Sequence, residues 1–356
     1  MPLRRPLAAA LLAGALAPAL AAQQTIGGCQ VLPDDSVWNT PVASLPVLPN
    51  STQIVGFVNT HCSGGGCTPR TTLKADFGSG LWQGAPIGIP YVAVPAGQTP
   101  VPIDFSIFGW PDESDPGPYP IPANAPIEGG PGSDGDRHVL VVRQGTCDLY
   151  ELYYSWPEGQ NGCVVPGSPP GWCGASGAVY DLGSNALRPD GWTSADAAGL
   201  PILPGLARFE EVQSGEIRHA LRFTASVTRD LTWVWPARHE AGSSTNANAP
   251  RMGERLRLRA DYPLAGFSTD VRVILVALKR YGMILADNGT NWFVSGIPNE
   301  GWDNDLLAQL ASVPGSAFEV VDVSSLRLGP DTGATPHLFS DGFETGATSA
   351  WSVTSP

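Results

Sequence analysis

Glycine and proline recur throughout this sequence and keep its apolar runs short. The chain contains 42 glycines and 35 prolines, and both residue types interrupt helices and strands more often than they extend them. The runs between them are rich in valine, tyrosine and tryptophan, as in GIPYVAVP and DLYELYYSW, a pattern typical of short strands joined by turns. The sequence therefore predicts a mainly β fold, a single-domain sandwich or jelly roll with one or two helices packed on its outside.

The chain divides by composition into three parts. Residues 1–22 have the pattern of a secretory signal peptide, because Arg4 and Arg5 precede an apolar run that ends in ALA. That run is too short to span a bilayer, so we expect a secreted domain, extracellular or periplasmic, over residues 23–323 with no membrane span. Residues 324–356 show no periodicity and much glycine, serine and threonine, which predicts a linker and a C-terminal tail.

One helix is predicted clearly, over residues 269–281. Its apolar residues lie on one face, Ser268 or the residue after it can cap its start, and Gly282 follows its end. Two shorter helices are expected over residues 51–59 and 305–311. Among the strands, RHVLVV and DLYELYYSW predict a hairpin, and IRHALRF and LTWVWPARH predict two consecutive strands.

Six cysteines in an exported chain predict three disulfides. The spacing favours Cys62 with Cys67 and Cys163 with Cys173, because each pair closes a short glycine-rich or proline-rich loop. That leaves Cys29 to pair with Cys147, although six cysteines also allow other connectivities.

The charge balance argues against nucleic acid as a partner. The formal net charge is −13, and only two lysines accompany the arginines. Binding to nucleic acid depends on clustered basic residues that neutralise phosphates. The sequence also lacks GxSxG, a phosphate-binding P-loop and a dinucleotide fingerprint, so nucleotide chemistry and a serine esterase are not expected.

Three histidines each follow an arginine on or beside a predicted strand: His138, His219 and His239. His138 and His219 share strand parity with apolar neighbours, so both should face inward. A buried imidazole needs a partner, which is either a structural hydrogen bond or a ligand. Convergence of the three in one cleft would allow acid–base catalysis, or it would allow metal binding. HExxH and HxH spacings are absent, so we expect no metal and no cofactor.

Carboxylates supply the second part of a candidate site. Five are candidates for an acid–base pair of the kind that cleaves glycosides, namely Asp115, Glu128, Asp136, Asp196 and Asp287. The first three lie on a long proline-rich loop or at its exit, where functional residues are common. Asp196 fits a helical turn and Asp287 fits the turn signal ADNG.

The working hypothesis assigns these residues to one cleft. His219 or His239 is the base, and Glu128 or Asp136 is the acid partner. Substrate-binding residues complete the cleft: Arg222, Arg238, His138, Trp192 and Trp235. Several of the eleven tryptophans lie beside glycine or proline, where their flat faces can stack on sugar rings.

The sequence thus predicts a secreted enzyme that cleaves glycosidic bonds in a polysaccharide or oligosaccharide, as a hydrolase or a lyase. Two alternatives stay open. A carbohydrate-binding or cell-envelope protein without catalysis would keep the aromatic residues but would need no clustered ionisable groups. A three-histidine metalloenzyme would require His138, His219 and His239 to meet at one point.

Long runs of the chain, among them SDPGPYPIP, DRHVLVV, RPDGWTSADAAGLPILPG, PARHEAG and YGMILADNG, resemble an uncharacterised family of exported bacterial proteins. The resemblance covers most of residues 29–323, implies export and brings no activity with it. The C-terminal run LFSDGFETGATSAWS resembles a short tail of some exported proteins of Gram-negative bacteria, which implies surface or export handling.

Overall fold

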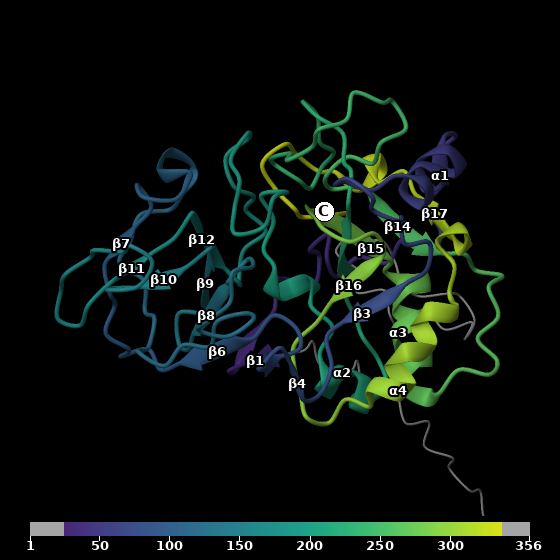
Figure 1. Ribbon diagram of the computed structural model, residues 1–356. Helices are drawn as coiled ribbons and strands as arrows, with labels where there is room; N and C mark the ends of the chain where they lie inside the picture. The colour runs from purple at the N-terminus through teal and green to yellow at the C-terminus, as the bar shows by residue number, and fades with distance from the viewer. Residues whose placement is uncertain (1–24, 337–356) are drawn as a thin grey trace, which may run out of the picture.

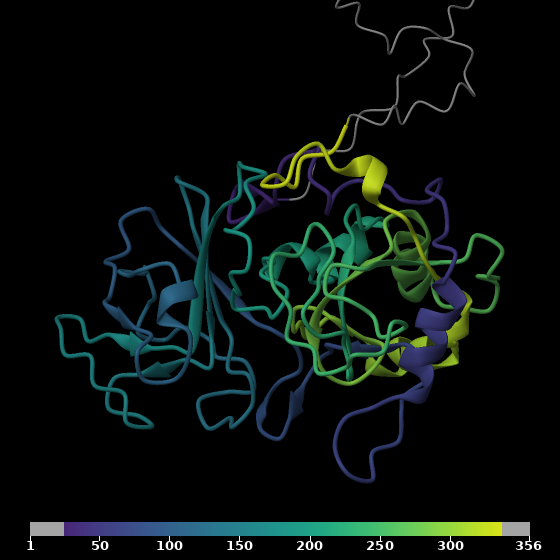
Figure 2. The same ribbon diagram turned by 90° about the horizontal axis from the view of Figure 1, so that it is seen from above.

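Two β-sheets occupy opposite halves of the molecule (Figures 1 and 2). The structure is a computed structural model and describes residues 25–336, so the expected signal peptide lies outside the described residues. Within them, strand (24%) exceeds helix (16%), which confirms the mainly β class. No helix of residues 25–336 is long and apolar enough to cross a bilayer.

The smaller main sheet has four strands. Its order is β12 (Ser176–Asp181), β9 (Asp148–Tyr153), β8 (Val139–Arg143) and β6 (Tyr91–Val94). β8 and β9 form the predicted antiparallel hairpin, whereas β6 pairs with β8 in parallel.

The larger sheet has six strands. Its order is β17 (Phe318–Val320), β14 (Arg255–Leu258), β15 (Met283–Asn288), β13 (Leu221–Ala225), β16 (Phe293–Ser295) and β3 (Lys74–Asp76). β13 and β15 are parallel neighbours at its centre, and β3 is an edge strand that runs parallel to β16.

Three small sheets complete the strands. They are β1 (Thr25–Ile26) with β2 (Cys29–Gln30), β4 (Leu81–Trp82) with β5 (Ala85–Pro86), and β10 (Trp156–Pro157) with β11 (Trp172–Cys173) and β7 (Ile103–Asp104).

The helices cover the larger sheet. They are α1 (Ser51–Thr60), α2 (Phe209–Ser214), α3 (Thr269–Arg280) and α4 (Asn304–Leu307). Short 3₁₀ helices run over Pro111–Glu113, Leu203–Gly205, Ala308–Ser312, Gly315–Ala317 and Ser324–Leu326.

The helices predicted over residues 269–281 and 51–59 are present as α3 and α1, whereas the one predicted over residues 305–311 is divided into α4 and the 3₁₀ helix Ala308–Ser312. In α3, the Ser268 hydroxyl accepts the Val271 amide as expected for a cap. In α1, the N-cap position is Asn50, and the hydroxyl of Ser51 instead accepts the amide of Val320 at 2.8 Å. Ser51 therefore joins α1 to β17 rather than capping its own helix.

The prediction of a strand over LTWVWPARH is wrong. Residues 231–239 contain only an isolated bridge from Trp233 to Met252. β13 also begins later than predicted, at Leu221, so His219 precedes the strand.

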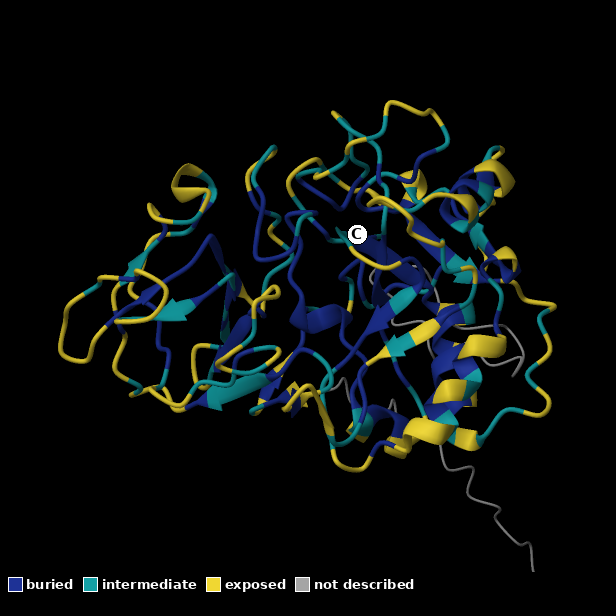
Figure 3. Cartoon of the chain, in the orientation of Figure 1, coloured by how far each residue is buried: buried dark blue, intermediate teal, exposed yellow. Residues whose placement is uncertain are grey.

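β8 is a continuous apolar run because both of its faces are buried (Figure 3). Leu140 and Val142 face the large core shared with the bigger sheet. Val139 and Val141 face a second core that is closed by Tyr119 and neighbouring residues. Alternate residues of a strand point to opposite faces, so a strand between two cores must be apolar throughout.

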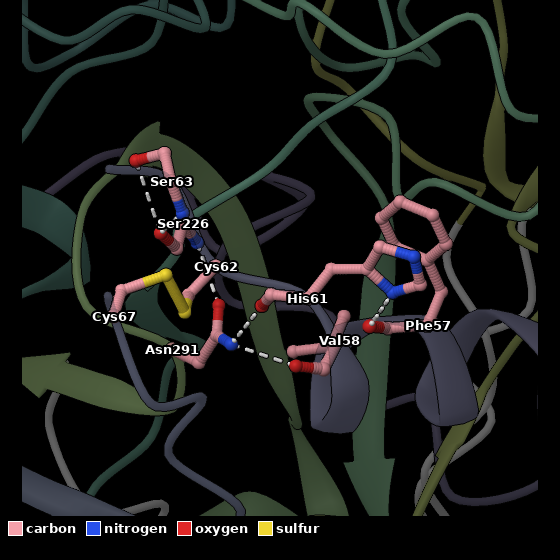
Figure 4. The surroundings of a disulfide bond; sticks show 8 residues. All are labelled: Phe57, Val58, His61, Cys62, Ser63, Cys67, Ser226 and Asn291. Carbon is pink, nitrogen blue, oxygen red and sulfur yellow. Dashed lines mark hydrogen bonds between the residues drawn. A yellow bond between two sulfur atoms is a disulfide. The ribbon is translucent and has the colours of Figure 1, made fainter. Parts of the chain in front are cut away.

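The three predicted disulfides are confirmed: Cys29–Cys147, Cys62–Cys67 and Cys163–Cys173. Beside the second of these, the Asn291 side chain donates to the carbonyls of Val58 and His61 and accepts the amide of Ser226 (Figure 4). This amide group fastens the end of α1 to the loop that precedes β16.

Residues 324–336 of the predicted linker contact the N-terminal part of the domain. The amide of Val37 donates to the carbonyl of Gly333 at 2.8 Å, and the hydroxyls of Thr40 and Thr335 are 2.7 Å apart and buried. Residues 324–336 are thus part of the packed domain, and the rest of the predicted tail lies outside the described residues.

We predict that the disulfides differ in their effect on stability. Cys29 and Cys147 are 118 residues apart, whereas Cys62 and Cys67 are separated by 5. In the chain-entropy model, the first bond stabilises the fold by about 5 kcal/mol and the second by about 2 kcal/mol. Urea unfolding of Cys29→Ser/Cys147→Ser should show the larger loss, with Cys62→Ser/Cys67→Ser as the matched comparison. Equal losses would contradict the prediction.

Candidate functional site

A buried segment, residues 193–206, joins the two main sheets and is called here the bridging segment. On one side, the carbonyl of Ser194 accepts the hydroxyl of Ser176, which begins β12. On the other side, the amide of Ala198 donates to the carbonyl of Ala286 in β15. A loop at this depth needs partners for its backbone groups, and the two sheets supply them.

Arg222 of β13 anchors the bridging segment through its charge. Its guanidinium donates to both carboxylate oxygens of Asp196, at 2.7 and 2.6 Å. It also donates to the hydroxyl of Ser295 at 2.7 Å and to Asp287 at 3.1 Å. Both Arg222 and Asp196 are buried. Such a charge is tolerated only where it is paired and hydrogen-bonded, so these four side chains form one unit.

Asp287, at the end of β15, is the carboxyl of this unit that has access to solvent. Burial raises its pKa well above the ordinary value, and the negative charge of Asp196 adds to this effect. The positive charge of Arg222 opposes both. Asp287 is therefore held toward its protonated form, as a carboxyl that can donate a proton.

His138 lies behind the same site, on the side of the four-stranded sheet. Its Nε2 is 3.0 Å from the carbonyl of Ala195, and its Nδ1 is 2.5 Å from Glu128. Burial alone would lower the pKa of His138, but the Glu128 carboxylate outweighs it and raises that pKa to about 10. The pKa of Glu128 is lowered in return, because the imidazolium outweighs the effect of burial. The pair is therefore charged.

A fixed backbone brings Asp136 to the same place. Arg137, the residue between Asp136 and His138, has a backbone φ of 53°, which residues other than glycine rarely adopt. Its buried guanidinium stacks 3.5 Å from the ring of Trp156 and donates to the carbonyls of Ser133 and Ser155. These contacts hold a strained residue in place and leave Asp136 exposed beside the buried His138.

Asp136 and Asp287 border a pocket of about 320 Å³, called here the inter-sheet pocket. The predicted site residues Arg222, His138 and Glu128 support these two carboxyls from behind and do not line the pocket. Its walls come from both main sheets, the bridging segment and the loops beside them. They are Trp110, Asp136, Tyr153, Ser176, Thr193, Ser194, Ala195, Ala197, His239, Ala241, Asp287 and Asn288. The pocket thus holds the exposed carboxylate, the carboxyl with the raised pKa, a histidine and two aromatic side chains.

His239 is placed so that one ring nitrogen is available. Its Nδ1 lies 3.0 Å from the carbonyl of Ala197. A carbonyl can only accept, so Nδ1 carries a proton. Its Nε2 is 3.9 Å from Glu113. In the neutral ring, Nε2 therefore has a lone pair that can accept a proton within the pocket wall.

The structure places the other predicted site residues elsewhere. His219 is buried, with its Nδ1 2.8 Å from the Ala220 carbonyl and its Nε2 3.1 Å from Glu211 of α2. Arg238 is also buried and donates to the carbonyl of Pro330 and to Asp331. Both hold the fold together, and neither lines the inter-sheet pocket.

The two tryptophans predicted to bind sugar also lie outside the inter-sheet pocket. Trp192 packs beside the guanidinium of Arg188, and Trp235 is buried, with its indole donating to the Thr332 carbonyl at 2.9 Å. The aromatic residues of the pocket are Trp110 and Tyr153 instead. Trp110 lies at the start of the proline-rich loop, in FGWPDES. Its position between a glycine and a proline is the feature of the sequence that could have indicated an exposed tryptophan.

The structure does not bring the three histidines together. Within residues 25–336, the group able to hold a metal ion is Glu128, Asp136 and His138, whose ligand atoms lie within 4.8 Å of one another. This donor set suits a cation that accepts two oxygens and one nitrogen. An ion there would have to displace the proton shared by His138 and Glu128.

Comparison with known proteins adds no relative. No family model matches the chain, and no curated protein or solved structure is significantly similar to it.

Glu151 of β9 holds the bridging segment through a carboxyl group whose charge depends on pH. Its carboxylate is fully buried and accepts the amides of Ile202 and Leu203 in the bridging segment, at 2.9 to 3.0 Å. Burial outweighs these two donors and raises the pKa of Glu151 to about 7, with a further contribution from the charge of Asp196.

We predict that Glu151 makes the fold less stable as pH rises. Because its pKa is about 7 in the folded state and near 4.5 in the unfolded chain, the folded state binds more protons between these values. The stability that this group provides is present below the lower pKa and is lost as pH rises through the higher one, by on the order of 3 kcal/mol. Urea unfolding from pH 5 to 8 should show this loss in the native protein and a flatter profile in Glu151→Gln. Glu300→Gln, at an exposed position, should keep the native profile. Parallel profiles for native protein and Glu151→Gln would contradict the assignment.

Proposed function

We propose that this protein is an exported enzyme that hydrolyses glycosidic bonds in a polysaccharide, with Asp287 as the general acid and Asp136 as its partner carboxylate. The observation that carries the proposal is the pairing in one pocket. Asp287 has a raised pKa, whereas Asp136 is exposed and its charge contributes to that raised pKa. Two carboxyls whose surroundings differ in this way can divide the acid and base roles of glycoside hydrolysis.

The chemistry follows from the two groups. Asp287 gives its proton to the glycosidic oxygen as the bond from that oxygen to the anomeric carbon breaks. Asp136 takes a proton from water as the water oxygen bonds to that carbon, or it attacks the carbon itself and water releases the sugar in a second step. Arg222 and Asp196 position Asp287 and set its pKa, but they do not touch the substrate.

A sugar chain is the substrate that suits these walls. Trp110 is 47% exposed and Tyr153 is half-buried, so each offers part of an aromatic face to the pocket. Such faces pack on sugar rings, and the polar groups beside them bond to hydroxyls. Export is supported by the three disulfides, which are typical of oxidising compartments, and by the pattern of residues 1–22.

Elimination is the second candidate reaction, and His239 favours it. A lyase removes the proton beside a uronate carboxyl group, and the available Nε2 of His239 could accept it. The products tell the two reactions apart. Hydrolysis leaves saturated ends, whereas elimination leaves a carbon–carbon double bond that absorbs in the ultraviolet.

We predict that Asp287→Asn and Asp136→Asn each lower the rate of polysaccharide cleavage by about 10²- to 10⁴-fold, because each removes one proton-transfer group. New reducing ends, measured over a panel of neutral and acidic polysaccharides, report the rate. Glu300→Gln is the control and should match the native enzyme. Full activity in both pocket variants would overturn the assignment, whereas binding without cleavage by the native protein would support a carbohydrate-binding protein.

We predict that cleavage slows as pH rises through the raised pKa of Asp287, because only the protonated carboxyl can act as acid. The kcat/KM profile of the native enzyme should therefore have a descending limb well above the ordinary pKa of an aspartate. A chelator provides the contrasting test. Activity that is lost with chelation and restored by one divalent metal would transfer catalysis to Glu128, Asp136 and His138.

A further inference from the structure

A second hollow, of about 660 Å³, lies at the edge of the six-stranded sheet and is called here the edge groove. Its lining includes Arg70, Lys74, Asp76, Trp82, Phe293 and Leu307. Arg70 lies in the loop before β3, and the other five come from β3, the β4–β5 hairpin, the start of β16 and α4 (Figure 1). None of them lines the inter-sheet pocket.

Two cations gather around one aromatic ring in the edge groove. The Nζ of Lys74 is 4.7 Å from the centre of the Phe293 ring, and the guanidinium carbon of Arg70 is 5.7 Å from it. The strand register fixes this arrangement, because Lys74 of β3 pairs directly with Phe293 of β16. Cation–ring contacts hold each charge in place, but they do not neutralise it.

Neither cation is paired with an acid. Among residues 25–336, no carboxylate lies within 4.0 Å of Arg70 or Lys74. Arg70 donates only to the carbonyls of Thr72 and Leu73, which orient it without balancing its charge. The charged residues that line the edge groove are Arg70, Lys74 and Asp76. The two cations outnumber the one carboxylate, so in a chain of net charge −13 the groove keeps a local positive charge that attracts an anion.

An exposed aromatic residue completes the edge groove. Trp82 is 70% exposed, and its neighbour Leu81 is 65% exposed. Because Trp82 lines the edge groove, its exposed indole face is open to a bound ligand. An indole face beside two cations matches a sugar ring that carries a negative group, because the ring stacks on the indole and the charge meets Lys74 and Arg70.

Asp76 relates the edge groove to the inter-sheet pocket. Asp76 of β3 pairs with Ser295 of β16. The Ser295 hydroxyl accepts a hydrogen bond from Arg222, and the same guanidinium also donates to Asp287. One strand pair and one guanidinium therefore connect the lining of the edge groove to the carboxyl of the proposed active site.

We propose that the edge groove binds an anionic sugar residue, a uronate, of the same polysaccharide that the inter-sheet pocket cleaves. This inference rests on the proposed function and names its substrate class, an acidic polysaccharide. Lys74 and Arg70 bind the carboxylate of the uronate, and Trp82 stacks on its sugar ring. The rest of the polysaccharide extends toward Asp136 and Asp287.

Binding to defined oligosaccharides tests the proposal without requiring cleavage. The probes are oligogalacturonate and alginate oligomers, a sulfated heparin oligomer and a neutral cello-oligosaccharide of equal length, measured by calorimetry on full-length Asp287→Asn protein. We expect the uronides to bind at least about 10-fold more tightly than the neutral probe, since each charge-assisted hydrogen bond contributes more than a neutral one. Their affinity should also fall as salt is added. Tighter binding of heparin than of both uronides would assign the site to sulfated sugars and overturn the uronate assignment.

Matched variants locate the binding. Lys74→Gln removes one charge at an exposed position without breaking a hydrogen bond seen in the structure, so it should fold normally and weaken uronide binding by about 10-fold. Arg70→Gln with Lys74→Gln should abolish the preference for uronides. Trp82→Ala should weaken both charged and neutral probes. Arg272→Gln, on the exposed face of α3, is the charge-matched control and should change nothing.

The outcomes separate this inference from the proposed function. Uronide binding that depends on Lys74, in a native protein that cleaves no polysaccharide, would support the edge groove and overturn the proposed hydrolysis. Cleavage of neutral polysaccharide with no effect of Lys74→Gln on binding or KM would support hydrolysis and overturn the anionic subsite.

Discussion

The charge of Arg222 is the constraint on which the centre of this protein depends. A guanidinium buried in a β-sheet is tolerated only when acids and hydroxyls surround it, and Asp196, Asp287 and Ser295 do so. Since Asp196 belongs to the bridging segment, satisfying Arg222 also fixes that segment between the sheets. The neighbouring carbonyls of Ala195 and Ala197 then orient the rings of His138 and His239. One buried charge therefore sets the positions of groups that come from both halves of the molecule.

The two halves contribute different chemistry to their shared boundary. The four-stranded side provides a charged pair, His138 with Glu128, and the exposed Asp136 next to it. The six-stranded side provides a carboxyl, Asp287, whose pKa is raised by burial and by the second acid that shares Arg222. Arg222 donates two hydrogen bonds to Asp196 and one to Asp287, so its charge does not fully offset the effect of burial on the pKa of Asp287. The buried network and the accessible pocket are thus two parts of the same electrostatic arrangement.

Local patterns predicted the local parts of the structure. The β8–β9 hairpin, α3 and the three disulfides follow from alternation, capping and spacing over short stretches. Parallel neighbours such as β13 and β15 join strands that are distant in the sequence, and single-strand patterns do not specify them. Likewise, the sequence pattern predicts that His138 and His219 both face inward. It does not show that Glu211 of α2 binds the ring of His219, which therefore lies outside the pocket. The sequence predicts Asp287 as one of five candidate carboxylates but does not single it out, because its raised pKa depends on burial and on Asp196, which lies far from it along the chain.

The joining of the two ends of the described chain affects the order in which the fold can form. The buried hydroxyls of Thr40 and Thr335, 295 residues apart, touch each other, and Ser36 and Ala334 bridge beside them. Contacts between such distant residues form only after most of the chain is available, and they are slow to form because closing a long loop costs entropy. During synthesis from the N-terminus, residues 36–40 therefore stay without these partners until residues 334–335 have been made. The stability that this contact adds to the domain is gained late in folding.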